Sequence, residues 1–429
     1  MKYSKTLGAI ALSSLLMVTS GYAKNTAFTN ANANEHANEN AKRKSISPYT
    51  RVAVLPGGMA DVARIAEKIA QYVVYTDESD KRGLGLPTNW VIAGANGGLD
   101  GNSGPETWEP SDLLPIPSFG TPAKGKARVI EFCNKAYATE AIDTGKFHGS
   151  ALPCEVSVHS DGTNIYVDML DAEAIFNIFF TDAKDKFDDA RNAEFAEMAS
   201  AVKDELRTMI KAGLEDDNGV SGSSAVVYTE STEELGPQFT QVQIDNDIAL
   251  RSPYIIYKYK RTGGGTFTLA DADTLAKEII AKLGTDAATA DTNVPGVSKD
   301  SEWRSGRPDP ISIPKVKVVE ACSPKYAKKA TALGNEYITA LPCEFTVYVD
   351  EDDTTNQTLG VSFLNPNFMF GTMFEGAVEN AYKTGKLTKA EVIEYSTLAD
   401  VVFADLHLIV DAAVQDSTLG IEIPHTPAP

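Results

Sequence analysis

The chain has 429 residues, of which 43% are hydrophobic, and a formal net charge of −20. This length exceeds that of one ordinary domain and suits two, each with enough apolar residues to form a core. An acidic chain repels phosphate groups, and basic residues cluster only at Lys42–Lys44. We therefore expect neither nucleic acid nor an anionic membrane surface as a partner.

The first 23 residues are typical of a secretory signal peptide. Lys2 and Lys5 precede an apolar run from Leu7 to Val18, and Ala23 ends a short segment suited to signal-peptidase cleavage. The run is shorter than the roughly 20 apolar residues of a membrane-spanning helix, and no later segment is long and apolar enough. We expect export, a periplasmic or extracellular mature chain, and no transmembrane segment.

Residues 24–49 are rich in Asn and Ala and carry almost no large apolar side chain. Such a segment buries too little surface to compensate for the entropy lost on ordering. We predict that it is a disordered linker between the signal peptide and the first folded domain.

A unit of 30 residues, Val129–Val158, occurs twice without gaps at a separation of 189 residues. Each copy contains Glu-x-Cys, then Tyr-Ala, then Leu-Pro-Cys-Glu. All four cysteines of the chain lie in this unit, Cys133 and Cys154 in the first copy and Cys322 and Cys343 in the second.

The duplication extends to both sides of this unit. Apolar positions of an early helix, beginning at Ile65, recur 210 residues later from Leu275, and those of a last helix recur from Phe195 to Tyr395 at a separation of 200. Each copy also places a Trp, Trp108 or Trp303, before a stretch that contains Pro-Ile. We predict repeat domains at 50–214 and 253–418, an acidic linker at 215–252 with a hairpin of strands 225–229 and 239–244, and a C-terminal tail at 419–429.

The paired cysteine motif, followed by a strand and a hairpin, resembles the domain of unknown function 302 family over residues 51–213 and 254–418. The resemblance implies an α+β fold with two repeated β-α-β4-α domains, each a curved antiparallel sheet packed on a long C-terminal helix. Because family members pair as dimers, it also implies a pseudo-dimer within one chain. The second copy keeps the motif more fully, with Pro324 and Pro366 where the first has Lys135 and Ala172. No biochemical function follows from the family.

Two evenly spaced cysteine pairs in an exported protein favour disulfides. We predict the structural bridges Cys133–Cys154 and Cys322–Cys343, each contributing about 3 kcal/mol to stability. A redox-active pair is the alternative, because Cys133 and Cys322 precede short helices whose N-termini would stabilise a thiolate. The lack of Cys-x-x-Cys and of an adjacent cation argues against it.

Glu131 and Glu320 share a strand face with the first cysteine of each pair, and a metal site could recruit them. We interpret them instead as solvent-exposed residues, as charged side chains mostly are. His148 lacks a second ligand nearby, and no other catalytic motif occurs. We therefore predict no catalytic residue, no metal and no cofactor, and name four candidate functional residues: Glu131, Glu320, Tyr137 and Tyr326.

A curved sheet that wraps a helix can leave an apolar cavity between the two. Its candidate lining residues are aromatic: Phe176, Phe179, Phe370 and Phe374. We expect a non-catalytic protein of the cell envelope that binds an unknown small ligand or protein partner, or that acts as a scaffold with further self-assembly. The alternative is a thiol/disulfide redox or sulfur-compound-handling protein that uses Cys322 and Cys343.

Overall fold

The computed structural model describes residues 45–74, 90–95, 127–152, 154–215, 227–284, 294–305, 309–340, 343–350 and 357–422, and the statements below concern these ranges. Both repeats belong to one unit, Ile46–Pro429. The predicted signal peptide, the predicted linker up to residue 44 and Trp108 lie outside the described residues. Within them, no helix combines the length and the hydropathy that a membrane-crossing segment needs.

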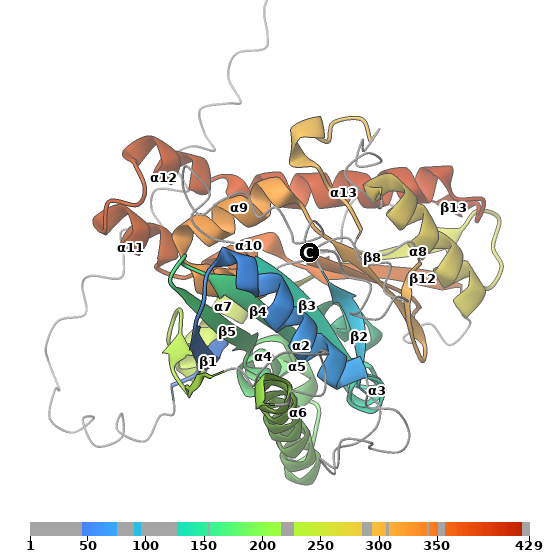
Figure 1. Ribbon diagram of the computed structural model, residues 1–429. Helices are drawn as coiled ribbons and strands as arrows, with labels where there is room; N and C mark the ends of the chain where they lie inside the picture. The colour runs from blue at the N-terminus through green and yellow to red at the C-terminus, as the bar shows by residue number, and fades with distance from the viewer. Residues whose placement is uncertain are drawn as a thin grey trace, which may run out of the picture. The chain divides into compact units, whose positions relative to one another are not determined.

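The first repeat is built on an antiparallel sheet (Figure 1). Its strand order is β2-β3-β4-β5-β1-β6, and β7 also pairs with β1. The strands are β1 (Tyr49–Pro56), β2 (Trp90–Ala95), β3 (Ala127–Asn134), β4 (Cys154–Ser160), β5 (Asn164–Leu170), β6 (Thr229–Glu230) and β7 (Glu234–Leu235).

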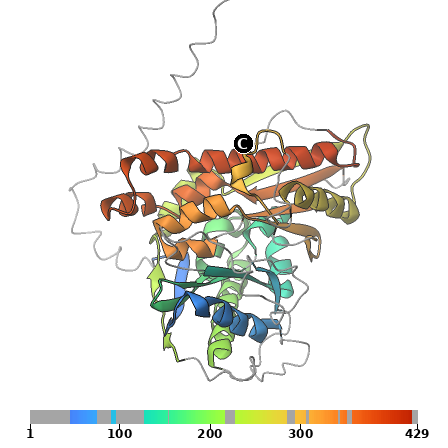
Figure 2. The same cartoon turned by 45° about the horizontal axis from the view of Figure 1, so that its top comes forward.

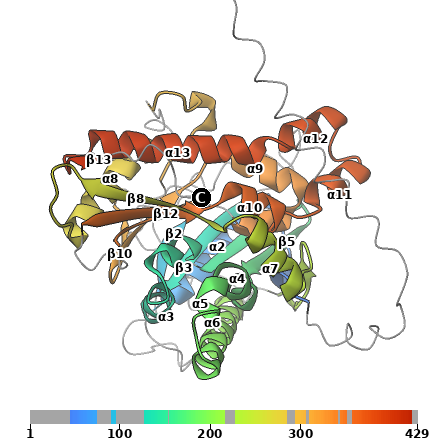
Figure 3. The same ribbon diagram turned by 180° about the vertical axis from the view of Figure 1, so that it is seen from behind.

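Helices of the first repeat cover one face of this sheet. Helix α2 lies against β3 and β4 and buries Ile65, Ala66 and Ile69, which recur at helical spacing. The long helix α6 packs on α2 and on α4 (Figure 3). The helical elements are η1 (Met59–Asp61), α2 (Val62–Val74), α3 (Lys135–Ile142), η4 (Lys146–Ala151), α4 (Ala172–Phe179), α5 (Thr181–Lys184) and α6 (Asp189–Glu215).

The second repeat has an antiparallel sheet of order β13-β8-β12-β11-β10-β9, with α8 on β10 and β11 and with α13 packed on α8 (Figure 2). Its strands are β8 (Tyr254–Arg261), β9 (Ile311–Ile313), β10 (Val316–Ala321), β11 (Cys343–Val349), β12 (Thr358–Leu364) and β13 (Ile421–Glu422). Its helical elements are α8 (Leu269–Leu283), η5 (Lys299–Ser301), α9 (Pro324–Leu333), η6 (Asn335–Ala340), α10 (Pro366–Gly371), α11 (Ala377–Lys383), α12 (Lys389–Tyr395) and α13 (Leu398–Asp416).

The predicted fold class is confirmed. Both repeats are α+β, both sheets are antiparallel, and a long helix, α6 or α13, ends each repeat. The central strands correspond in order, β3-β4-β5-β1 in the first sheet and β10-β11-β12-β8 in the second.

The segment predicted as a linker, 215–252, contains more structure than expected. Strands β6 and β7 extend the first sheet along β1. The predicted strand at 239–244 is wrong, because Thr240 and Gln243 form a capping box that starts helix α7 (Gln241–Leu250). The predicted tail also contributes β13, which pairs with β8.

The two repeats form the predicted pseudo-dimer, and their contacts are reciprocal. Tyr49, the first residue of β1, donates a hydrogen bond of 3.2 Å to the carbonyl of Met373 in the second repeat. Tyr254, the first residue of β8, donates one of 2.9 Å to the carbonyl of Phe179 in the first. Likewise η4 packs on β11 and β12, whereas η6 packs on β4 and β5. Each contact occurs twice with the roles exchanged, as across the interface of a symmetric dimer.

Candidate functional site

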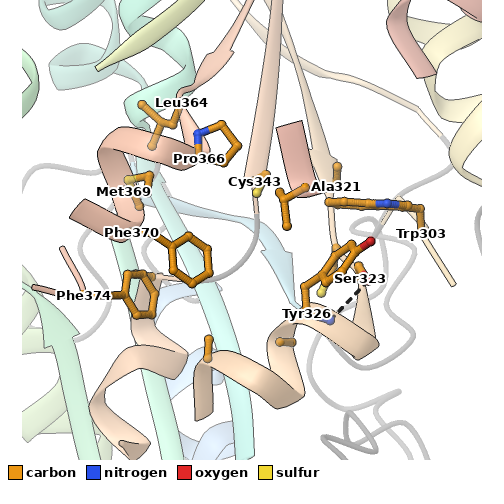
Figure 4. A pocket seen from close by; sticks show the side chains of 15 residues that line it. Trp303, Ala321, Ser323, Tyr326, Cys343, Leu364, Pro366, Met369, Phe370 and Phe374 are labelled. Atoms are coloured by element: carbon orange, nitrogen blue, oxygen red, sulfur yellow. Dashed lines mark hydrogen bonds between the residues drawn. The ribbon is translucent and has the colours of Figure 1, made fainter. Parts of the chain in front are cut away.

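A cavity of about 60 Å³, partly open to solvent, lies in the second repeat between the sheet and helices α9, α10 and α13. Phe370 and Phe374 form one side of it, and Trp303 and Tyr326 lie across from them (Figure 4). Its wall is mainly apolar and consists of Trp303, Ala321, Cys322, Ser323, Tyr326, Ala327, Ala330, Ala340, Cys343, Leu364, Pro366, Met369, Phe370, Phe374 and Val402.

Local sequence explains how two helices start at this cavity. Ser323 follows the end of β10 and accepts a hydrogen bond from the backbone N–H of Tyr326, which caps α9, and Pro324 occupies the first turn. Asn365 follows β12 and caps α10 in the same way, with Pro366 in its first turn. The motif residues of the second copy therefore set where strands end and cavity helices begin.

A buried acid, Asp405 of α13, holds Trp303 and Tyr326 in place on their side of the cavity. Its Oδ2 accepts hydrogen bonds from Trp303 Nε1 at 2.9 Å, from the Tyr326 hydroxyl at 2.7 Å and from Ser301 Oγ at 3.0 Å. Burial and the hydrogen bond to Asp405 raise the pKa of Tyr326, so its phenol stays neutral and donates. The candidate residue Tyr326 thus connects α9 to α13.

The first repeat contains the same arrangement around Glu205 of α6. Trp90 Nε1 donates to its Oε2 at 2.7 Å, and the Tyr137 hydroxyl donates to its Oε1 at 2.5 Å. Trp90 is therefore the counterpart of Trp303 in this arrangement, and Trp108 lies outside the described residues. Sequence reasoning missed both acids, although Glu205 and Asp405 recur at the separation of 200 residues that the last helix shows.

One substitution separates the two repeats at this position. Phe132 lies opposite Cys154 in the first sheet, and Ala321 lies opposite Cys343 in the second. The Phe132 ring is fully buried in the sheet–helix core of the first repeat. Ala321, at the equivalent position of the second repeat, lines the cavity.

The other two candidate cavity residues, Phe176 and Phe179, lie in packed regions. Phe176 stacks on Phe180, with ring centroids 4.7 Å apart. Phe179 contacts Phe368 of the second repeat edge to face, with centroids 5.8 Å apart. Both rings are at most 8% exposed and belong to the large core cluster that joins the repeats.

All four cysteines are free thiols, so the predicted bridges are absent from the structure. Cys154 lies opposite Phe132 rather than Cys133, so the two cysteines of a pair are offset by one residue in the strand register. The thiols of each pair are near enough to interact, and Cys322 and Cys343 both line the cavity, but no bond joins them. Burial raises the pKa of Cys322 to about 12 and raises the pKa of Cys343 further. Thiols that stay protonated are poor nucleophiles, which disfavours the redox interpretation.

The glutamates of the motif lie between the two repeats instead of facing solvent, so their interpretation as an exposed strand face is wrong. Glu131 lies opposite Glu155, and Glu320 lies opposite Glu344. All four side chains are at most 4% exposed. No group of three or more His, Cys, Asp or Glu side chains in the described ranges has the geometry of a metal site.

The carboxyl groups of this cluster pair across the repeats. The carboxyl group of Glu131 is near enough to that of Glu320 to share a hydrogen bond when one of the two is protonated, and the same holds for Glu155 and Glu344. Each pair joins equivalent positions, so the cluster lies on the pseudo-twofold axis. Burial, followed by the charge of neighbouring carboxyl groups, raises the pKa of Glu131, Glu155 and Glu344 well above the ordinary value.

Comparison with known proteins agrees with this duplicated geometry. Residues 119–213 and 309–390 each match the family described as Domain of unknown function DUF302. The chain is a tandem repeat of this domain. Both matched regions include the strand with Glu-x-Cys and the strand that starts at the second cysteine. No curated protein matches the chain significantly.

Proposed function

We propose that this DUF302 tandem protein binds a small, mainly apolar molecule, or the end of an apolar chain, in the cavity of its second repeat. The observation that carries the proposal is the cavity itself, which Phe370, Phe374, Trp303 and Tyr326 enclose. Such a concave apolar site with few polar groups is typical of ligand binding.

The size of the cavity limits its occupant. A volume of about 60 Å³ equals roughly two waters at their share of liquid volume, and a cavity of about 150 Å³ admits benzene. A short alkyl group matches this space, whereas an aromatic ring needs the wall to move. We therefore favour an alkyl ligand of few heavy atoms.

The polar atoms of the wall support an apolar occupant. The indole N–H of Trp303 and the hydroxyl of Tyr326 already donate to Asp405, so their rings rather than their polar atoms are available to a ligand. Cys322 and Cys343 carry protonated thiols, and a buried thiol behaves as a small hydrophobic group. This arrangement suits non-catalytic binding better than thiol chemistry.

Export is part of the proposal, and the N-terminal sequence supports it. Cleavage after Ala23 would leave a periplasmic or extracellular chain that begins at Lys24. N-terminal sequencing of the protein recovered outside the cytoplasm tests this, and we expect Lys24 as its first residue. Recovery of an uncleaved chain in the cytoplasm would contradict export.

Straight-chain alcohols from ethanol to hexanol are suitable probes of the cavity. We expect the NMR signal of the Trp303 indole N–H to shift on titration, with a Kd on the order of 1 mM for the better alcohols, given the affinity that a few heavy atoms supply. Affinity should rise with chain length until the cavity is full. The Trp303 signal can be assigned from the variant Trp303→Phe.

Two variants serve as test and control. Ala321→Phe introduces the ring found at this position in the first repeat and should reduce alcohol affinity at least about tenfold by occupying the space. Ala390→Leu adds apolar volume at an exposed position of α12 and should leave the affinity unchanged. Equal binding by the wild type and Ala321→Phe would rule out this cavity as the site.

A further inference from the structure

We propose that Glu131, Glu155, Glu320 and Glu344 form a proton-dependent lock between the two repeats, closed while each carboxyl pair holds a proton and weakened when the pairs ionise. The cluster lies on the pseudo-twofold axis, and each repeat supplies two of its members. A hydrogen bond between two carboxyl groups requires a proton on one of them. Closing both pairs, Glu131–Glu320 and Glu155–Glu344, therefore requires two protons.

The surroundings of the cluster supply little positive charge to replace those protons. None of the electrostatic partners of Glu131, Glu155 and Glu344 among the described residues is Lys, Arg or His. Both carboxyl oxygens of Glu131 are buried and accept no hydrogen bond from an N–H or hydroxyl donor of these residues. Two ionised carboxylates in such a place would repel each other without solvation.

Other titratable groups reach the cluster from the elements packed around it. The thiols of Cys154 on β4, of Cys343 on β11 and of Cys322 just after β10 border it, and their raised pKa keeps them neutral. Tyr49 of β1 interacts with Glu155, with Tyr337 and with Glu336 of η6, and burial raises the pKa of its phenol. Glu336 interacts in turn with Asp168 and His159, which together with Arg51 form the next charged group. The groups nearest the cluster are therefore neutral or acidic.

The direction of the pH effect follows from these environments. In the unfolded chain the glutamates titrate near their ordinary pKa of about 4.3. In the folded chain the pKa is raised, so folding takes up protons at any pH between the two values. The stabilising effect of the lock is complete below about pH 4.3 and is lost as the pH rises through the raised folded values.

Urea unfolding at a series of pH values tests the lock in the purified full-length protein. Each proton taken up on folding makes the unfolding constant rise about tenfold per pH unit, so two protons predict about 100-fold per unit. In Glu131→Gln/Glu155→Gln, each amide can donate to the remaining carboxylate without a proton. Between about pH 5 and pH 8, the pH dependence of the unfolding constant should show that this variant takes up about two fewer protons on folding than the wild type. At the alkaline end of this range we expect the variant to be more stable than the wild type.

The control Glu197→Gln/Glu234→Gln removes two exposed acids and should keep the pH dependence of the wild type. Identical slopes for the wild type and the double cluster variant would overturn the proposal. If the double variant does not fold, the single variant Glu155→Gln serves instead, and it should take up about one fewer proton on folding than the wild type.

Infrared spectroscopy supplies a readout that does not depend on unfolding. The folded wild type at neutral pH should show the C=O stretch of protonated carboxyl groups, and the double cluster variant should lose it. Absence of this band in the wild type would contradict the lock. Stabilisation by added Ca²⁺, Mn²⁺ or Zn²⁺ at neutral pH, reversed by a chelator, would overturn it in favour of a cation held by the four carboxylates.

Discussion

The two repeats share a frame and differ in how the space inside it is used. Both fix a Trp and a Tyr with an acid on the last helix, Glu205 or Asp405. In the first repeat Phe132 fills the space beside this group, and in the second Ala321 leaves a cavity there. Duplication has preserved the part that holds the fold together, while the side chain opposite the second cysteine of each motif differs between the repeats.

A second difference lies in the acid. Glu205 uses both carboxyl oxygens for two donors, whereas Asp405 gathers three donors, including Ser301, on Oδ2. The shorter side chain thereby also fixes η5, the turn that precedes Trp303. For this reason the acid of the second repeat accepts more side-chain hydrogen bonds than the acid of the first.

The largest predicted effect comes from removing the residue that distinguishes the repeats. Phe132→Ala should lower the free energy of unfolding by about 3–5 kcal/mol, since it leaves a cavity where a fully buried ring stood. The same variant should gain a second site for short alcohols in NMR titration. Phe187→Ala, at a half-buried ring between α5 and α6, provides the control for urea unfolding. A loss no greater than that of the control would refute the filling role of Phe132.

Replacing either acid should lower the free energy of unfolding, by an amount that follows the number of hydrogen-bond donors the acid accepts from. Asp405→Ala leaves three buried donors without their acceptor and should cost about 3 kcal/mol, and Glu205→Ala leaves two and should cost about 2 kcal/mol. Urea unfolding measures both values. A larger loss for Glu205→Ala would contradict the ranking, and an unchanged indole signal of Trp303 in Asp405→Ala would contradict its positioning role.

The smallest effect is expected at the cysteines. Cys322→Ala/Cys343→Ala should cost less than about 2 kcal/mol, since it removes two small buried groups and not a cross-link worth about 3 kcal/mol. Denatured protein prepared without reductant should titrate as four thiols. A requirement for reductant would show that the cysteines pair in solution, contrary to the free thiols of the structure.

The pH dependence of thiol labelling in the native protein tests whether Cys322 is a protonated thiol. With a pKa of about 12, the thiolate fraction of Cys322 should rise about tenfold per pH unit across the neutral range. The labelling rate of the native Cys133→Ala/Cys154→Ala variant should follow this rise. A rate that levels off near neutral pH would indicate a reactive thiolate and revive the redox interpretation.

Much of this molecule could be inferred from its sequence. The 189-residue repeat located both domains, and apolar spacing located α2, α6, α8 and α13, because a buried helix face must recur every three to four residues. Asn365 and Pro366 likewise set the start of α10 through their own chemistry, as an N-cap residue followed by Pro does. These features depend on neighbours along the chain, and local sequence contains them.

What the sequence could not decide depends on contacts between the repeats and on register. Glu131 resembles any charged strand residue until the second sheet covers that face, and covering it makes the residue part of a buried carboxyl pair. Cys133 and Cys154 resemble a disulfide pair in the sequence, whereas the structure holds them as free thiols that are offset by one residue in the strand register. Only the tertiary structure brings such distant residues together, because a strand pattern specifies which residues share a face but not what lies against it.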